Sequence, residues 1–246
     1  MKILHIVRHA EAVSKTTDIP DFERALVKKG VKGARAVARR LRRCGFSADA
    51  MVSSPANRAM ETAHVFAQEL NFPVDKIELN RTMYENSDRT SLLTLVHGFP
   101  GESSDAFLFG HDPSFSEFAK HMVQGFDSVM PKGAVVTVAF ETDSWADVGP
   151  GQGKLIGFDY PMSKTEETRR YKSARKEIAT ILVTAMNHEL QRLDSRAAEI
   201  MKPFTDKTAR KAAERFIELA PSVVSGTRAI PRADEKGERS ASPSDC

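Results

Sequence analysis

The sequence predicts an α/β fold in which a mainly parallel sheet lies between two layers of helices. Short apolar runs, several of them β-branched, alternate with longer stretches whose apolar residues recur at helical spacing. The first run, residues 3–7, is short and bounded by charged residues, as is typical of a central parallel strand. The alternation ends at residue 164, where a long helical pattern begins. We therefore expect a three-layer α/β/α domain over residues 1–163, followed by a helical extension.

The elements of the α/β part follow one another as alternating strands and helices. The last two strands are joined by a polar segment, residues 141–153, that contains glycine, and this favours an antiparallel hairpin. The expected strands are 2–8, 50–53, 76–79, 105–109, 134–140 and 154–159, and the expected helices are 28–44, 56–70, 88–97 and 113–124.

Residues 164–220 are expected to form a helical extension. A long apolar stripe begins after Thr165 and ends at Pro203, and a second helix is expected over about 206–219, which would give a two-helix hairpin. Three interpretations of the stripe stay open: it docks onto the α/β domain, joins two protomers as a homo-oligomer, or holds another protein. Residues 221–246 are dominated by Pro, Ser, Gly and charged residues, which predicts a disordered tail.

Arg8 and His9 directly follow the first expected strand. Ligands of open α/β sheets bind beyond the carboxyl ends of the strands, so both side chains are expected at the mouth of the sheet. Arginine offers a permanent charge and a planar donor fork for phosphate oxygens, and a neutral imidazole can attack phosphorus. The pair alone fits an ordinary polar strand end equally well, and its meaning depends on partners elsewhere.

Two such partners lie at the ends of other expected strands. Arg58 lies in the first turn of a helix, where a guanidinium beside the helix N-terminus makes an anion site. His111 follows Gly110, which permits a close approach of the backbone. Phosphoryl transfer spreads charge over three equatorial oxygens, which two arginines and a second imidazole can stabilise. The guanidiniums also favour a neutral His9 by lowering its pKa.

The motifs that carry these residues resemble those of the histidine phosphatase superfamily, and within it the small SixA-type phosphohistidine phosphatases. The resemblance covers residues 1–163 and implies a phosphoglycerate mutase-like fold. It also implies that His9 is the nucleophile that becomes transiently phosphorylated, that Arg8, Arg58 and His111 surround the phosphoryl group, and that neither metal nor cofactor is used. The motifs are RHAEA at 8–12, ALVKKG at 25–30, SSPANRAMETA at 53–63, GHDP at 110–113, and GAVV at 133–136 followed by Trp145.

Three positions sharpen or qualify the resemblance. Ala10 stands where glycine is commonest, and alanine would be strained there if the backbone needed a positive φ. Glu85 lies where acid-using branches of the superfamily carry a catalytic glutamate, but a solvated loop carboxylate is an equal interpretation. Asn57, beside Arg58, is a candidate phosphate ligand, and capping the helix is the alternative.

Composition is compatible with a soluble enzyme. The chain has 246 residues, of which 41% are hydrophobic, enough for one substantial core and an appendage. It shows no signal-peptide pattern and no apolar stretch long enough to span a bilayer, and Cys44 and Cys246 make no disulfide framework. We therefore expect a cytoplasmic protein without a membrane partner.

The formal charge of +3 is modest but unevenly distributed. The first long helix carries a basic face, interpreted either as a solvated surface or as a dock for an acidic phosphoprotein. No recognition motif or interleaved aromatic platform accompanies the charge, so nucleic-acid binding is not expected. The basic residues are Lys28, Lys29, Lys32, Arg35, Arg39, Arg40, Arg42 and Arg43.

The leading functional hypothesis is a phosphohydrolase that works through a phosphohistidine intermediate on His9, acting on phosphohistidine in a protein. A broad phosphomonoesterase acting on small phosphorylated substrates is the closest alternative. A phosphate-binding scaffold that works through its C-terminal helices is the alternative from another class. Glu85 bears on the choice, because phosphate esters need a proton donor for the leaving group much more than phosphohistidine does.

Overall fold

A computed structural model describes residues 1–16, 18–193 and 195–219. The described residues form a six-stranded sheet in the order β3-β2-β4-β1-β5-β6. Neighbouring strands from β3 to β1 are parallel, whereas β5 is antiparallel to both β1 and β6. The mainly parallel sheet and the antiparallel last pair confirm the prediction. The strands are β1 (Lys2–Arg8), β2 (Ala50–Ser53), β3 (Glu78–Leu79), β4 (Asp105–Gly110), β5 (Val135–Phe140) and β6 (Lys154–Asp159).

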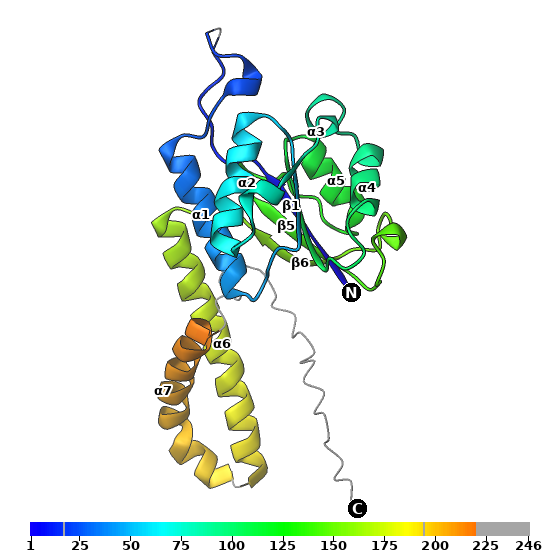
Figure 1. Cartoon of the computed structure of the whole chain (residues 1–246). Coiled ribbons are helices and arrows are strands. Elements are labelled where there is room, and N and C mark those ends of the chain that lie inside the picture. Colours follow the sequence, from blue (N-terminus) through cyan, green and yellow to red (C-terminus); the bar gives the residue numbers. More distant parts are fainter. Residues whose placement is uncertain (17, 194, 220–246) are drawn as a thin grey trace, which may run out of the picture.

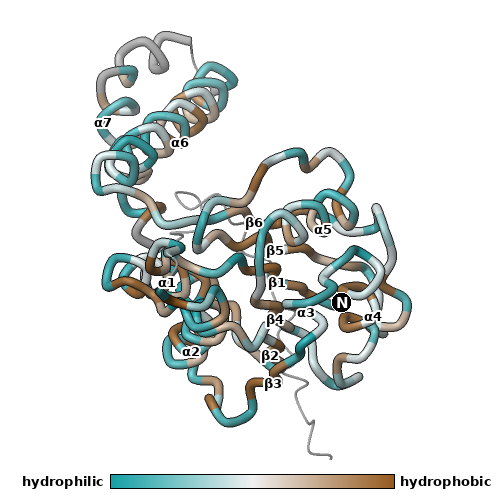
Figure 2. The backbone as a smooth tube through the Cα atoms, turned by 90° about the horizontal axis from the view of Figure 1, so that it is seen from above, coloured by the Kyte–Doolittle hydropathy of each residue, from teal (hydrophilic) through white to brown (hydrophobic). Residues whose placement is uncertain are grey.

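Helices cover both faces of the sheet and complete the three layers (Figures 1 and 2). Successive side chains of a strand point to opposite faces. Accordingly, Ile3 and Val7 of β1 pack with α1 and α2, while Leu4 and Ile6 pack with α4 and α5. The helices are α1 (Lys28–Arg43), α2 (Asn57–Leu70), α3 (Thr82–Glu85), α4 (Arg89–His97) and α5 (Ser114–Met122), and the short 3-10 helices are η1 (Asp21–Glu23), η2 (Val74–Lys76) and η3 (Trp145–Asp147).

The connection after β4 shows why glycine is needed at this edge of the sheet. A Cβ built on Gly110 would lie 2.3 Å from the Phe115 ring, so a side chain there would force this buried ring to shift. This close approach confirms the role expected of Gly110. Parallel pairing sets Arg8 directly beside Gly110, so β1 and β4 end together. The residues that follow these two strands therefore lie close together, at the edge of the sheet that faces η1 and α3 (Figure 1).

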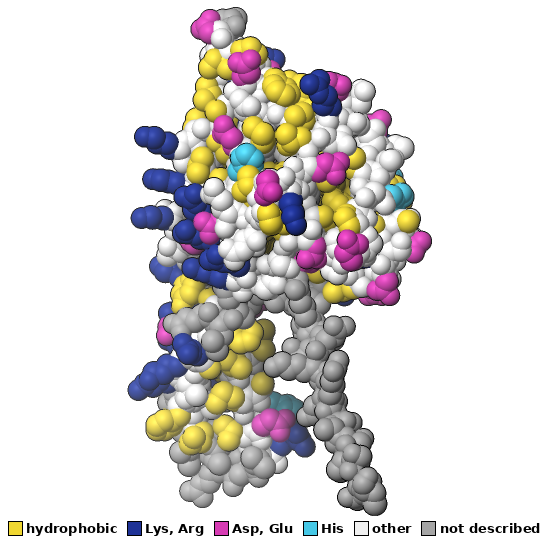
Figure 3. All heavy atoms as spheres, viewed as in Figure 1, with side chains coloured by type: hydrophobic (Ala, Val, Ile, Leu, Met, Phe, Trp, Pro, Cys, Tyr) yellow, Lys and Arg dark blue, Asp and Glu magenta, His cyan; other side chains and the backbone are white. Residues whose placement is uncertain are grey.

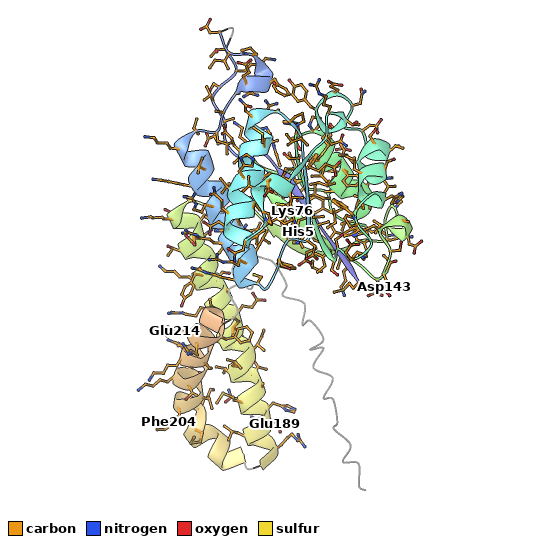
Figure 4. All side chains as sticks on the ribbon, viewed as in Figure 1. His5, Lys76, Asp143, Glu189, Phe204 and Glu214 are labelled. Carbon is orange, nitrogen blue, oxygen red and sulfur yellow. The ribbon has the colours of Figure 1, made fainter. Side chains whose placement is uncertain are left out.

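The C-terminal helices α6 (Lys164–Leu193) and α7 (Ser195–Leu219) lie side by side as a hairpin. The hairpin begins near α1 and extends away from the sheet (Figure 1), with Glu189 and Phe204 near its far end (Figure 4). The expectation that Pro203 ends the first helix was wrong. α6 ends at Leu193, α7 begins at Ser195, and Pro203 lies inside α7. Proline removes one backbone hydrogen bond and therefore indicates a helix end in sequence, but here the helix continues through it.

Two expectations concern membranes and the tail. None of the helices in the described part of the chain is long and apolar enough to cross a membrane. The tail expected over residues 221–246 lies outside the described residues.

Candidate active site

The four residues expected to bind phosphate come together at the ends of three strands. The rings of His9 and His111 lie with their centroids 5.3 Å apart. Arg8 precedes His9, and Arg58, from the first turn of α2, is close enough to lower the pKa of both histidines by its charge. His9 and Arg58 are only 8% and 5% exposed, so these two side chains form the buried part of the candidate site.

The tautomer of His9 follows from one hydrogen bond. Its Nδ1 lies 2.8 Å from the carbonyl oxygen of Ala10. A carbonyl oxygen can only accept, so Nδ1 carries the proton in the neutral ring. The lone pair is then left on Nε2. The backbone of the next residue therefore fixes which nitrogen of His9 can act as a nucleophile.

Both histidines are held neutral at physiological pH. Burial is the main cause that lowers the pKa of His9 to about 4, with the charges of Arg58, Arg8 and Arg24 adding to it against the raising effect of the Ala10 hydrogen bond. Burial likewise lowers the pKa of His111 to about 3, with Arg58 and His9 contributing. A neutral imidazole is the nucleophilic form. His111 Nε2 also lies 2.8 Å from the Ser54 hydroxyl oxygen, which fixes its ring.

The two arginines are held from behind by acceptors of the protein. Arg8 donates to the carbonyl oxygen of Met130 at 2.5 Å and lies 3.5 Å from the Asp112 carboxylate. Among the described residues, the buried Nε atoms of Arg8 and Arg58 and the buried Nδ1 of His111 have no hydrogen-bond partner. Unpartnered buried polar atoms are rare in native proteins, and several in one cluster point to a functional site. An anion with several acceptor oxygens suits such a cluster.

Asp21, in η1, is a part of the site that the sequence did not reveal. Its carboxylate accepts from Arg58 Nη2 at 2.9 Å, and its backbone carbonyl accepts from Arg58 Nη1 at 2.5 Å. Arg24 donates to the other carboxylate oxygen through Nε at 3.0 Å and Nη2 at 2.8 Å. Burial works against ionisation, but the bonds and charges of the two arginines outweigh it and lower the pKa of Asp21. Asp21 therefore stays ionised and orients Arg58.

Tyr84, in α3, reaches the site where Glu85 was expected. Its ring lies edge-on to His111 with a centroid distance of 5.7 Å, and its hydroxyl donates to Asp21 at 3.3 Å. Burial, followed by the charge of Asp21, raises the pKa of Tyr84, so the hydroxyl keeps its proton. Glu85 is exposed at the end of α3, and no hydrogen bond or ion pair joins its side chain to another residue of the described chain.

Ala10 and Asn57, two residues that bear on the resemblance to the superfamily, both form hydrogen bonds within the described chain. Ala10 is buried and donates its N–H to Thr62 Oγ1 at 3.0 Å, and it is not among the described non-glycine residues with a positive φ, so the alanine is unstrained. Asn57 Nδ2 donates to the backbone carbonyl of Glu23 at 3.0 Å, which ties α2 to η1. The N-cap of α2 is Ala56, without a side-chain capping bond.

The basic face of α1 is partly neutralised within the molecule. Three arginines of the face surround the single carboxylate of Glu69, with Arg39 at 3.0 Å and Arg35 at 3.2 Å. Arg40 turns inward and forms a 2.7 Å ion pair with the buried Asp159. The remaining lysines and arginines project to solvent along α1 (Figure 3). The face is therefore less cationic than its sequence indicates.

The described residues contain no group of three or more His, Cys, Asp or Glu side chains placed to hold a metal ion. The cationic, histidine-containing cluster around His9 suits an anion rather than a cation.

Comparisons with known proteins agree with this geometry. The model of the histidine phosphatase superfamily (branch 1) matches residues 4–84, a range that contains Arg8, His9 and Arg58. The fold resembles that of a SixA phosphohistidine phosphatase homologue from Nakamurella multipartitia, with a TM-score of 0.55 over 66% of this chain and 97% of that one at 20% identity. The N-terminal third of this chain is therefore similar to the histidine phosphatase superfamily, and its α/β fold is similar to that of a SixA homologue.

Two further solved structures have a similar fold. One, described as a SixA homologue from Agrobacterium tumefaciens, gives a TM-score of 0.55 at 20% identity, over 65% of this chain and 99% of the other. A protein histidine phosphatase SixA in complex with tungstate gives 0.54 at 18% identity, over 65% of this chain and 97% of the other. No curated protein sequence matches the chain. At such identities the likeness concerns the fold.

Proposed function

We propose that the α/β domain of this chain is a protein phosphohistidine phosphatase that works through a phosphorylated His9. The observation that carries this proposal is the tautomer of His9, whose Nδ1 donates to Ala10 and whose ring lies beside His111 within the influence of the charges of Arg8 and Arg58. The likeness to structures described as SixA phosphatases supports the same substrate class. We also propose the division expected from the sequence, in which residues 1–163 carry the chemistry, 164–220 form a helical extension and 221–246 form a tail.

In the first step, Nε2 of His9 attacks phosphorus, and the bond from phosphorus to the leaving group breaks in line with the attack. The charge on the equatorial oxygens is stabilised by Arg8, Arg58 and His111. When the leaving group is an imidazole, its other ring nitrogen can already carry a proton, so the ring departs as neutral imidazole and no strong acid is needed from the protein. In the second step, water attacks the phosphorus on His9, releases inorganic phosphate and regenerates the neutral ring. No step requires a metal or cofactor.

The direct test is to trap the phosphoryl group. Brief reaction with a labelled phosphohistidine protein, followed by quenching in alkali, where phosphohistidine survives, is expected to leave label on His9. His9→Ala should lose both the label and the turnover, by roughly 10³-fold or more, because the nucleophile is removed. If the purified protein shows neither labelling nor turnover, the scaffold alternative is favoured instead.

Glu85 separates phosphohistidine from ester substrates. Its carboxylate is exposed and has no partner within the described chain, so it is free to reach a leaving group. We expect Glu85→Gln to slow hydrolysis of phosphate esters by roughly tenfold or more and that of phosphohistidine far less, because alkoxide leaving groups need a proton. Side-by-side rates on both substrates measure this. Equal losses would remove Glu85 as a discriminating acid.

A further inference from the structure

Two aromatic rings from distant segments form a surface that the proposed chemistry does not use. We call Phe22, in η1, and Tyr84, in α3, the aromatic lip. Their ring centroids lie 5.2 Å apart at 87°, and Tyr84 in turn lies edge-on to His111. Phe22 is 39% exposed although it is a large apolar residue. The lip therefore runs from a phosphate-binding histidine out to solvent.

The lip is held in place by polar contacts. The Asp21 carboxylate receives the Tyr84 hydroxyl at 3.3 Å and Arg58 at 2.9 Å, so the residue before Phe22 is joined to both α2 and α3. On the other side of Phe22, the backbone carbonyl of Glu23 accepts from Asn57 at 3.0 Å. A three-residue helix has little stability of its own. These contacts on both sides fix where the Phe22 ring lies.

The geometry of in-line phosphoryl transfer places the leaving group near the aromatic lip. An in-line transfer requires the leaving group to lie opposite the attacking nitrogen of His9. His9 and Arg58 form the buried part of the site, so the leaving group must point outward, toward the mouth. The lip is the aromatic surface at that mouth, in contact with His111.

We propose that Phe22 and Tyr84 form a subsite for the leaving group that takes a planar ring, such as the imidazole of phosphohistidine, in preference to an aliphatic group. The proposal rests on the proposed function, since it places a leaving group in line with His9. Aromatic rings prefer edge-to-face and offset-stacked partners, a preference that an aliphatic chain does not share.

Two phosphonates test the subsite without turnover, because the enzyme cannot transfer a phosphoryl group across their P–C bond. Phenylphosphonate carries a ring at the position of the leaving group, and methylphosphonate does not. Calorimetry on the full chain is expected to show that phenylphosphonate binds about 3- to 10-fold more tightly, as for a single aromatic contact. Phe22→Leu should abolish this ratio and leave methylphosphonate binding unchanged within about twofold, and Tyr84→Leu should abolish the ratio as well.

Two control variants isolate the ring. Tyr84→Phe keeps the ring and loses the hydroxyl bond to Asp21, and it should keep the preference. Phe216→Leu, at a 49% exposed phenylalanine of α7, should change neither affinity. Thermal unfolding of every variant checks that it is folded.

Different experimental results would overturn the aromatic lip and the proposed function. Equal binding of both phosphonates, or a ratio that survives in both leucine variants, overturns the lip while labelling and turnover on His9 stand. Failure of both phosphonates to bind overturns the lip together with the phosphate pocket. A ring preference that depends on Phe22 supports the subsite even if the turnover assay fails.

Discussion

The α/β domain and the C-terminal hairpin bury their apolar side chains to very different extents. In the domain, large side chains such as Phe66, Phe107 and Phe118 are completely buried on both faces of the sheet. In the described part of the hairpin, the buried apolar residues are Ala174, Ala209, Ala213 and Ile217, and several larger apolar side chains face solvent. The difference indicates that the densely packed sheet domain provides a rigid support for the candidate site. In the hairpin, the two helices pack mainly through small side chains and leave several large apolar side chains exposed to solvent.

The larger side chains of the hairpin show this most clearly. Ile181 and Phe204 are each 61% exposed, and Phe216 is 49% exposed. A groove of about 860 Å³ is lined by residues of both helices, among them Tyr171 and Val183 of α6 and Arg210 of α7. Two helices alone cannot cover every side of an apolar stripe. The hairpin therefore presents a surface, whereas the domain encloses a core.

The largest expected difference between the two regions is in stability. Phe66→Ala removes a ring packed edge-on to Phe109 at 5.4 Å and should lower the free energy of unfolding by about 3–5 kcal/mol. Phe216→Ala removes the same ring from a half-exposed position and should cost less than about 1 kcal/mol. Urea unfolding measures both. Similar losses at the two positions would contradict the contrast in packing.

The next difference is in activity, at two arginine–carboxylate pairs. Arg58→Lys should reduce kcat/KM by roughly 10²-fold, because one ammonium cannot bond both Asp21 and a phosphoryl oxygen in the geometry of a guanidinium. Arg175→Lys makes the same change at the exposed Arg175–Glu214 pair of the hairpin, which is 2.7 Å long, and should leave kcat/KM within about twofold. A loss at Arg175 as large as that at Arg58 would show that the hairpin takes part in catalysis.

A smaller expected effect is the pH dependence of the stability of the α/β domain. Burial lowers the pKa of His5 to about 3, and His9 and His111 are lowered similarly. The unfolded chain protonates these histidines near pH 6.5 while the folded one does not, so stability is fully present above that pH and falls as the pH drops toward 4. Each histidine should contribute a slope of about 1.4 kcal/mol per pH unit in this window.

The contribution of a single histidine to this pH dependence can be measured at His5. Its ring stacks on Phe107 at 4.0 Å within the sheet, away from the substrate. His5→Phe retains an aromatic ring there and should make the fall in stability shallower by one histidine's share. Unfolding curves recorded between pH 7 and 4.5 give the slope directly. An unchanged slope would mean that His5 is protonated in the folded protein.

Much of the fold could be predicted from the sequence because local patterns determine it. The strand at 2–8 and the helix at 28–44 are bounded by charged residues or turn residues, and the structure places β1 and α1 within one residue of those limits. The juxtaposition of Arg8, Arg58 and His111 followed from one rule about the ends of parallel strands. These predictions required no knowledge of long-range contacts.

The parts that escaped prediction depend on such contacts. Asp21 reads as an ordinary acidic residue of a loop, and only the folded chain brings it to Arg58, 37 positions away. The sequence does not single out Tyr84, because the carboxylate of the neighbouring Glu85 is the more usual proton donor. The spacing of Asp21 and Arg24, three residues apart, is a local signal for their ion pair. The end of α6 at Leu193 could not be predicted, because Pro203 is the stronger sign of a helix end.

The position of Asp21 between Arg58 and Tyr84 has a consequence for how the proposed activity could diversify. One carboxylate holds both the arginine proposed to bind phosphate and the aromatic ring beside His111. The segment around η1 is thus a compact module whose exchange would alter the proposed leaving-group side of the pocket without rebuilding the sheet. A change of substrate choice would then require changes in only a few consecutive residues, while His9 keeps its own hydrogen bond to the neighbouring Ala10.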